Sequence, residues 1–264
     1  MADTTYRLVN AIGRLALRAL DVRVHWSGVE HVPTTGPVIL AATHVSYPDF
    51  VFVERVAAER GRYVRFLTRH DVWVPGVRGL LDRMGHVPVD RQAPAAAYLR
   101  ARRLLRQGEA LGIFPEAGIS YSYTVRGLMK GAAALARETG APVVPVAIWG
   151  PQRIHTVGIP EPRPSFARGR RVDLSFGPPL YADPVVDLSE WTVELGHTLT
   201  TMLEALQAMP AHQPRPGELA PWHPAHLGGD APTRAAARDH DAVPNNAVAP
   251  TWMSLAERAH QPGP

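Results

Sequence analysis

The feature that most constrains the fold of this chain is an alternation of short apolar runs, rich in β-branched residues, with longer helical stretches. The apolar runs lie at residues 38 to 43, 63 to 68, 86 to 90, 110 to 114, 143 to 149 and 171 to 176. The helical stretches lie at about 49 to 60, 77 to 84, 94 to 107, 128 to 139 and 188 to 208. Strands that alternate with helices are typical of a parallel sheet. We therefore predict an α/β fold with a mainly parallel central sheet flanked by helices.

The chain divides into three parts by composition. With 264 residues, 45% of them hydrophobic, it can bury one full α/β core, which we assign to residues 21 to 209. Residues 1 to 20 are predicted to form a basic amphipathic helix. Residues 210 to 264 are rich in Pro, His and Ala, and are predicted to be a largely irregular tail. We expect His212, His223 and His226 in this tail to be solvated, because no carboxylate or Cys companion stands at metal-ligand spacing.

Charge and cysteine content limit the possible chemistry. The chain contains no Cys, which excludes disulfides, thiolate metal sites and a cysteine nucleophile. Its formal net charge of +4 suits an anionic partner such as a lipid headgroup, a nucleotide or a nucleic acid. Nucleic-acid binding predicts aromatic residues interleaved with basic ones, whereas the arginine-rich stretch 99 to 109 has no aromatic residue, so we expect no nucleic-acid partner.

The N-terminal helix has two possible roles. Apolar residues recur at helical spacing, while Arg7, Arg14 and Arg18 gather on another side. The apolar side either packs on the core or lies on an anionic membrane surface. Neither a signal peptide nor a membrane span is visible, so we expect a cytoplasmic protein. The apolar residues are Leu8, Val9, Ile12, Leu15, Ala16, Ala19 and Leu20.

A histidine and an aspartate follow the first predicted strand. His44 comes just after residues 38 to 43, and Asp49 stands five positions later, where Pro48 favours the start of a helix. In open α/β sheets, reacting groups collect beyond the carboxyl ends of strands. A turn at this point could bring Asp49 back to His44, so that the carboxylate fixes one imidazole N–H and leaves the other nitrogen as a base.

Two rival readings of this region are weaker. Ser46 could be a serine nucleophile beside His44, but the Gly-x-Ser-x-Gly turn that such hydrolases use is absent around it. A metal site formed by His44, Asp49 and His86 has no third ligand at a familiar spacing, and we expect no bound metal.

A second strand end carries polar groups as well. The strand predicted at residues 110 to 114 runs into Phe114, Pro115 and Glu116, followed by a loop of small and hydroxyl-bearing residues. The two strand ends could therefore face one cleft.

The ordered pair of motifs resembles the glycerolipid acyltransferase family, which includes bacterial 1-acylglycerol-3-phosphate acyltransferase. His-x4-Asp is followed about 70 residues later by Phe-Pro-Glu, and the resemblance covers roughly residues 20 to 180. It implies a fold like that of glycerol-3-phosphate acyltransferase, with His44 and Asp49 as the catalytic dyad.

The resemblance also implies residues that bind substrate. A second family block resembles residues 68 to 91 and implies that Arg69 and Arg91 bind phosphate. The third block implies that Glu116, Gly118 and Ser120 orient the acceptor, although Ile119 stands where the family usually has arginine. Arg126 and Lys130 could supply the missing charge. A fourth block, Val144, Pro145 and Val146, would shape a strand or an acyl pocket.

The activity implied is O-acyl transfer from acyl-coenzyme A or acyl carrier protein, without a cofactor, to a hydroxyl of a glycerol-phosphate or lysophospholipid acceptor. We expect 1-acylglycerol 3-phosphate as the acceptor, in phospholipid synthesis. Glycerol 3-phosphate, another lyso-lipid, or a non-catalytic protein that binds anionic lipid are the alternatives. The lipid product implies a protein peripherally associated with the inner face of the plasma membrane.

Overall fold

The computed structural model describes residues 2–90, 92–158, 161–241, 243 and 247–252. Within these residues one seven-stranded sheet has the order β1-β7-β6-β2-β5-β3-β4, and all neighbouring strands pair parallel except β6 with β7. The strands are β1 (Arg23–Ser27), β2 (Val38–Ala42), β3 (Val64–Arg69), β4 (Val87–Val89), β5 (Ala110–Ile113), β6 (Val143–Trp149) and β7 (Arg171–Phe176).

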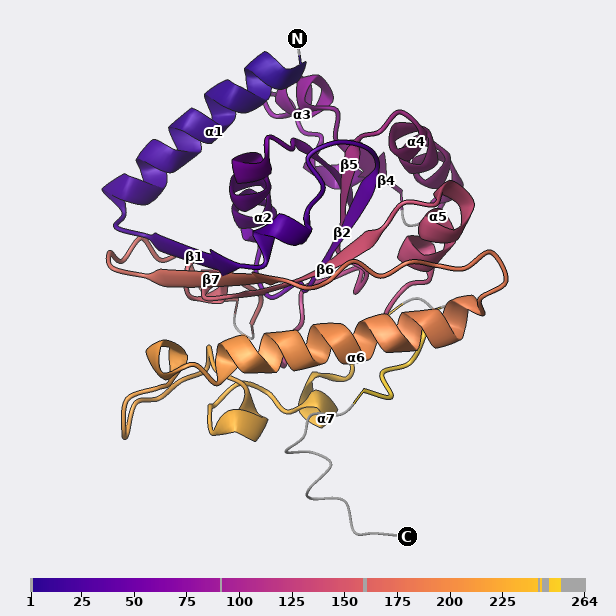
Figure 1. Ribbon diagram of the computed structural model, residues 1–264. Coiled ribbons are helices and arrows are strands. Elements are labelled where there is room, and N and C mark those ends of the chain that lie inside the picture. The colour runs from indigo at the N-terminus through magenta and orange to yellow at the C-terminus, as the bar shows by residue number, and fades with distance from the viewer. Residues whose placement is uncertain (1, 91, 159–160, 242, 244–246, 253–264) are drawn as a thin grey trace, which may run out of the picture.

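Helices cover the sheet in two groups. On one side α1 contacts both α2 and α3, and a second row is formed by α4, α5 and α6, of which α6 packs along β6 (Figure 1). The helices are α1 (Ala2–Ala19), α2 (Asp49–Ala57), α3 (Arg78–Met84), α4 (Ala95–Arg106), α5 (Gly131–Thr139), α6 (Leu188–Gln207) and the short α7 (Arg234–Ala237). The predicted α/β class with a mainly parallel sheet is confirmed.

Every strand predicted from the sequence is present, and β1 is an additional one. It lies at the edge of the sheet, where four of its five residues are exposed, and it pairs only with β7 among the described strands. An exposed edge strand needs no continuous apolar run, so the run that marks buried strands is absent from it.

The centre of the sheet places the two motifs together. β2 is buried at all five of its residues and pairs in parallel with β5 on one side and β6 on the other. Parallel neighbours end at the same edge, so the residues that follow β2 and β5 emerge side by side. His44 follows β2 by two residues and Glu116 follows β5 by three.

The N-terminal helix α1 docks through a face other than the one the apolar spacing indicates. Tyr6 is fully buried and donates its hydroxyl to the carbonyl of Val64, while Asn10 donates to Glu54 of α2 at 3.4 Å. Leu8, Ile12 and Leu15 are instead 62%, 60% and 69% exposed. The core-packing reading is therefore wrong for these three residues, whose apolar face is exposed.

Glu54, beneath α1, gives the fold a pH dependence. Burial raises its pKa to about 7, against the lowering effect of the Val64 amide, of Asn10 and of Arg65. Because the folded pKa lies above the ordinary value, the folded state holds the proton more tightly. The contribution of Glu54 to stability is therefore largest below the ordinary pKa and is lost as pH rises through about 7.

We expect Glu54→Gln to remove the loss of stability that wild type shows as pH rises through about 7. Burial lowers the pKa of His86 to about 4, so this side chain has the opposite slope below neutral pH, and only the difference between variant and wild type isolates Glu54. Between pH 6 and pH 8 the free energy of unfolding in urea should fall less steeply in Glu54→Gln, by up to about 1.4 kcal/mol per pH unit. Glu59→Gln, at an exposed carboxylate, is the control. Parallel curves for Glu54→Gln and wild type would contradict the assignment.

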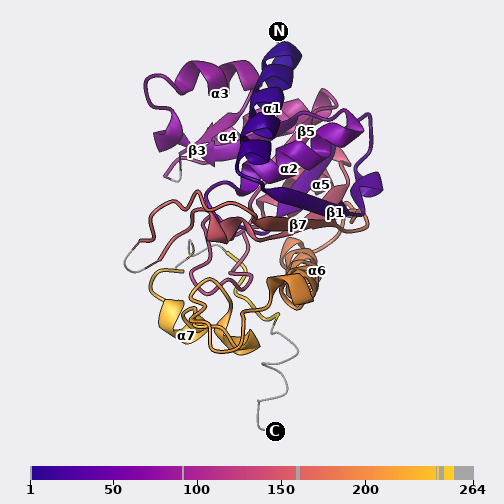
Figure 2. The same ribbon diagram turned by 90° about the vertical axis from the view of Figure 1, so that its left-hand side faces the viewer.

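The residues after α6 are short helices and turns that pack against the rest of the protein. His212 and His223 are 1% and 0% exposed, and His212 Nε2 lies 2.8 Å from Asp173 Oδ2 of β7. The expectation that these two histidines are solvated is therefore wrong. Trp252 is also fully buried, and a Cβ at Gly196 of α6 would come within 2.3 Å of its ring. Figure 2 shows this C-terminal part in yellow on the α6 side of the sheet. The domain boundary at residue 209 stays a prediction.

Candidate active site

His44 and Asp49 form a hydrogen-bonded pair at the carboxyl end of β2. His44 Nδ1 lies 2.9 Å from Asp49 Oδ2, with the Asp49 side chain fully buried and the His44 side chain 18% exposed. The same carboxylate oxygen accepts the amides of Val45 and Ser46, each at 2.8 Å. The backbone thus holds the carboxylate in place, and the carboxylate assigns the Nδ1 proton. The remaining nitrogen, Nε2, is then the basic one.

Ser46 holds the Asp49 carboxylate of this pair in place. Its side chain is completely buried, and its hydroxyl donates to Asp49 Oδ1. A nucleophile must reach the substrate and be activated by a base. In this structure the Ser46 hydroxyl is instead bonded to the carboxylate that orients His44.

The imidazole plane of His44 is fixed by an aromatic stack. Phe114, the residue after β5, lies with its ring centroid 4.1 Å from that of His44 at an interplanar angle of 18°. Phe66 of β3 stacks in turn at 5.8 Å from Phe114. A ring held on one face by Phe114 and at Nδ1 by Asp49 has little rotational freedom, which favours a defined direction for Nε2.

Glu116 braces the backbone of His44. Its Oε1 accepts the His44 amide at 2.8 Å, and its Oε2 accepts the Arg126 amide at 2.9 Å. Burial raises the pKa of Glu116 to about 7, while the two backbone donors lower it. The side chain is 1% exposed, so the structure shows a structural brace, and contact of Glu116 with an acceptor stays a prediction.

The loop after Glu116 is sharply bent and internally bonded. Ala117 and Tyr123 both adopt positive φ values, 54° and 55°. Ser120 is buried, and its hydroxyl donates a hydrogen bond to the Thr124 carbonyl at 2.7 Å. Its amide donates to the His44 carbonyl at 3.0 Å. The loop therefore binds the backbone carbonyl of His44, and Glu116 binds its backbone amide.

The guanidinium of Arg126 packs directly against the Cα of Gly118. A Cβ at Gly118 would come within 2.4 Å of Arg126 Nη1, so a glycine makes room for the guanidinium. Arg126 is 8% exposed, donates Nη1 to the Ile119 carbonyl at 3.2 Å, and holds its Nε 3.5 Å from Asp241 Oδ1. Its charge is thus directed at a carboxylate of the same chain, and a role on substrate phosphate stays a prediction.

Of the other predicted cations, Arg69 and Lys130 interact with other parts of the chain. Arg69 ends β3, is exposed, pairs with Asp71, and lines an open hollow of about 270 Å³ with Asp90 and Gln92. Arg91 lies outside the described residues. Lys130 immediately precedes α5 and lies near Asp187. The pKa of Asp187 is lowered mainly by hydrogen bonds from the amides of Glu190 and Ser189, and also by the charge of Lys130.

A contact that sequence reasoning missed is Asp241. It lies 115 positions beyond Arg126 in a part of the chain without periodic pattern, so no spacing signal marks it. Among the described residues, no group of three or more His, Cys, Asp or Glu side chains is placed to hold a metal ion. In the same part of the chain, no helix is both long and apolar enough to cross a bilayer.

Comparison with known proteins finds a family model and several relatives that match this chain. A family model described as Acyltransferase matches residues 23–149, which include His44, Asp49 and Glu116. The 1-acyl-sn-glycerol-3-phosphate acyltransferase of Borreliella burgdorferi is 27% identical over 150 residues, which are 55% of this chain and 58% of that protein. That of Bacillus subtilis is 27% identical over 124 residues, which are 46% of this chain and 60% of that protein. The chain thus spans less than two thirds of the length of these relatives.

The fold has a solved counterpart. The crystal structure of the 1-acyl-sn-glycerophosphate (LPA) acyltransferase PlsC from Thermotoga maritima superposes with a TM-score of 0.67 at 24% identity, over 77% of this chain and 80% of that one. The sheet with its flanking helices thus has the fold of that solved structure. The family model and these relatives support a glycerolipid acyltransferase family for this chain.

Proposed function

We propose that this protein is an O-acyltransferase of phospholipid synthesis, with 1-acylglycerol 3-phosphate as the acceptor and acyl-coenzyme A or acyl carrier protein as the donor. The observation that carries the proposal is the His44–Asp49 pair, 2.9 Å apart, whose imidazole is partly exposed while its carboxylate is buried. The names of the relatives support the choice of acceptor.

The geometry suits direct transfer. His44 Nε2 takes the proton of the acceptor hydroxyl as its oxygen attacks the thioester carbonyl, and Asp49 stabilises the resulting imidazolium. A C–O bond forms, the C–S bond breaks, and the leaving thiolate receives the proton from His44. No acyl group is attached to the enzyme, which agrees with the buried position of Ser46.

The acceptor is tested with a panel. Purified protein is mixed with palmitoyl-coenzyme A or with palmitoyl-acyl carrier protein. Each donor is combined in turn with 1-acylglycerol 3-phosphate, glycerol 3-phosphate and lysophospholipids that carry other headgroups, and thiol release and lipid products are measured. We expect release that depends on 1-acylglycerol 3-phosphate and yields the diacyl lipid. If another acceptor alone gives product, Ile119 marks an altered acceptor specificity. If folded protein releases no thiol with any acceptor and either donor, it is a lipid-binding protein that retains the dyad.

We also propose that α1 holds the protein on the inner face of the plasma membrane. Its uncovered face carries Leu8, Ile12 and Leu15, each at least 60% exposed, while Arg14 and Arg18 lie exposed on the same helix. An apolar face flanked by cations suits a helix that lies in an anionic interface. The acyl substrates and products partition into bilayers, which makes a surface the natural place of action.

We expect Leu8→Ser, Ile12→Ser and Leu15→Ser, combined, to reduce binding to vesicles of anionic phospholipid at least about tenfold, because each buried apolar side chain contributes about 1.5 kcal/mol or more. Since Tyr6 and Asn10 stay in place, the fold should be unaffected. Sedimentation with vesicles measures binding. Val185→Ser at an apolar side chain 90% exposed elsewhere is the matched control. Equal sedimentation of the triple variant and wild type would exclude α1 as the anchor.

A further inference from the structure

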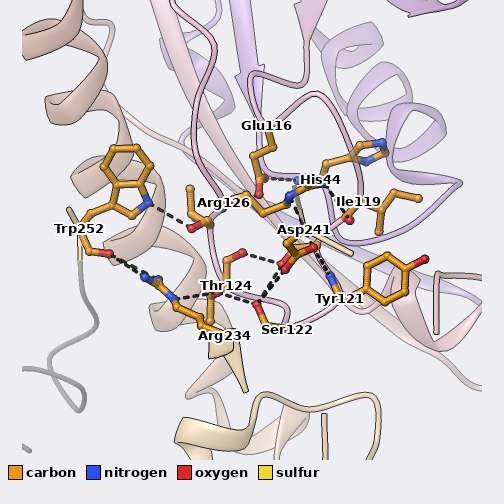
Figure 3. A network of polar contacts seen from close by, with 12 residues as sticks. His44, Glu116, Ile119, Tyr121, Ser122, Thr124, Arg126, Arg234, Asp241 and Trp252 are labelled. Carbon is orange, nitrogen blue, oxygen red and sulfur yellow. Dashed lines mark hydrogen bonds and ion pairs between the residues drawn. The ribbon is translucent and has the colours of Figure 1, made fainter. Parts of the chain in front are cut away.

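The loop that braces His44 is held by the C-terminal part of the chain. Asp241 Oδ1 accepts the Tyr121 amide at 3.0 Å and lies 3.5 Å from Arg126 Nε, and its Oδ2 accepts the Ser122 hydroxyl at 3.5 Å (Figure 3). One carboxylate thus contacts three residues of a single loop. The Asp241 side chain is 14% exposed and that of Arg126 is 7% exposed, so the pair is largely screened from solvent.

Further contacts from the same part of the chain fasten the rest of this loop. Arg234 Nε donates to the Thr124 hydroxyl at 2.9 Å. The Trp252 indole donates to the Val125 carbonyl at 3.2 Å. Val248 and Leu128 exchange two backbone hydrogen bonds, at 2.8 and 3.0 Å. Figure 3 shows Arg234, Asp241 and Trp252 arranged along the loop.

The loop in turn determines where His44 stands. The Ser120 amide, next to Tyr121, donates to the His44 carbonyl at 3.0 Å. The Arg126 amide donates to Glu116, whose other oxygen accepts the His44 amide. Two short routes therefore lead from Asp241 to the two backbone polar groups of His44, one through Tyr121 and its neighbour Ser120, the other through the Arg126 ion pair and Glu116.

We propose that Asp241 is a positioning residue for acyl transfer: it holds the loop of residues 117 to 128 in the conformation that fixes the backbone of His44. It lies outside residues 23–149, the segment that the family model covers, so this chain completes its active site with a residue of its C-terminal part. The effect on turnover rests on the proposed acyltransferase function, whereas the effect on the loop does not.

Asp241→Ala removes the acceptor of the Tyr121 amide and a carboxylate that pairs with the buried Arg126. We expect kcat to fall about 10- to 100-fold, because a small displacement of a catalytic group has effects of this size. The KM for the acyl donor should change by less than about twofold, because a displaced His44 alters the chemical step and not donor binding. Amide hydrogen exchange of His44, Ser120, Tyr121 and Arg126 should speed up, while that of β2 and β5 should not.

Asp239→Ala is the matched control, because it removes the same charge two positions away at an exposed site. If Asp241→Ala does not fold, Asp241→Asn, which keeps the side-chain volume but not the charge facing Arg126, replaces it in both measurements. Wild-type kcat, or exchange in the loop equal to that of the control, would overturn the proposal. If wild type shows no transferase activity, the proposed function fails, and hydrogen exchange alone decides whether Asp241 holds the backbone of His44.

Discussion

Replacing His44 with alanine is expected to lower kcat/KM for acyl transfer by roughly 10²- to 10⁴-fold, the usual contribution of a positioned general base. The variant should fold normally, because the backbone bonds of His44 to Glu116 and Ser120 do not involve its side chain. The measurement is thiol release from palmitoyl-coenzyme A in the presence of the acceptor that the panel identifies.

His25→Ala is the control for this variant. His25 is an exposed residue of β1, so the same substitution there removes an imidazole without touching the dyad. We expect its activity to equal that of wild type. Activity of His44→Ala within threefold of the control, from folded protein, would mean that another group accepts the acceptor proton.

Asp49→Asn is expected to lower kcat about 10²-fold or more, because a neutral amide does not stabilise the imidazolium as a carboxylate does. The side chain keeps its size, and an amide oxygen can still accept the backbone amides of Val45 and Ser46. The loss should therefore appear in kcat and not in thermal stability, which separates orientation of His44 from support of the fold.

The control for Asp49→Asn is Asp239→Asn, which makes the same change at an exposed carboxylate. Thermal unfolding and kcat are measured on both variants. If Asp49→Asn retains wild-type kcat, Asp49 serves only to hold the turn before α2, and the dyad interpretation is wrong.

The parts of this protein that sequence could predict are those with a local signal. Buried strands such as β2 and β6 carry continuous apolar runs, because both of their faces are covered. The dyad was predictable because His44 and Asp49 are neighbours in sequence, joined by one turn at a strand end.

The parts that sequence could not predict depend on distant contacts. The apolar spacing of α1 indicates a buried face with Leu8, Ile12 and Leu15. The helix docks instead through Tyr6 and Asn10, because these side chains form hydrogen bonds with Val64 and Glu54. Periodicity records which residues are apolar, and not which face is buried.

Asp241 is a clearer case of a distant contact. The residues it holds lie more than 100 positions earlier, and its segment carries only the composition of an irregular tail. Composition predicts little regular structure there, and α7, at four residues, agrees. It cannot predict that an irregular segment packs against the loop that braces His44.

The central claim is that the dyad transfers an acyl group directly to a lipid hydroxyl. It is tested most directly by incubating wild-type protein with palmitoyl-coenzyme A, first alone and then with the identified acceptor, and following thiol release together with the intact mass of the protein. The account predicts no mass gain and no thiol release above background without acceptor, and thiol equal to acylated lipid once acceptor is added. Free fatty acid, or a protein that gains one acyl group in the absence of acceptor, would contradict it.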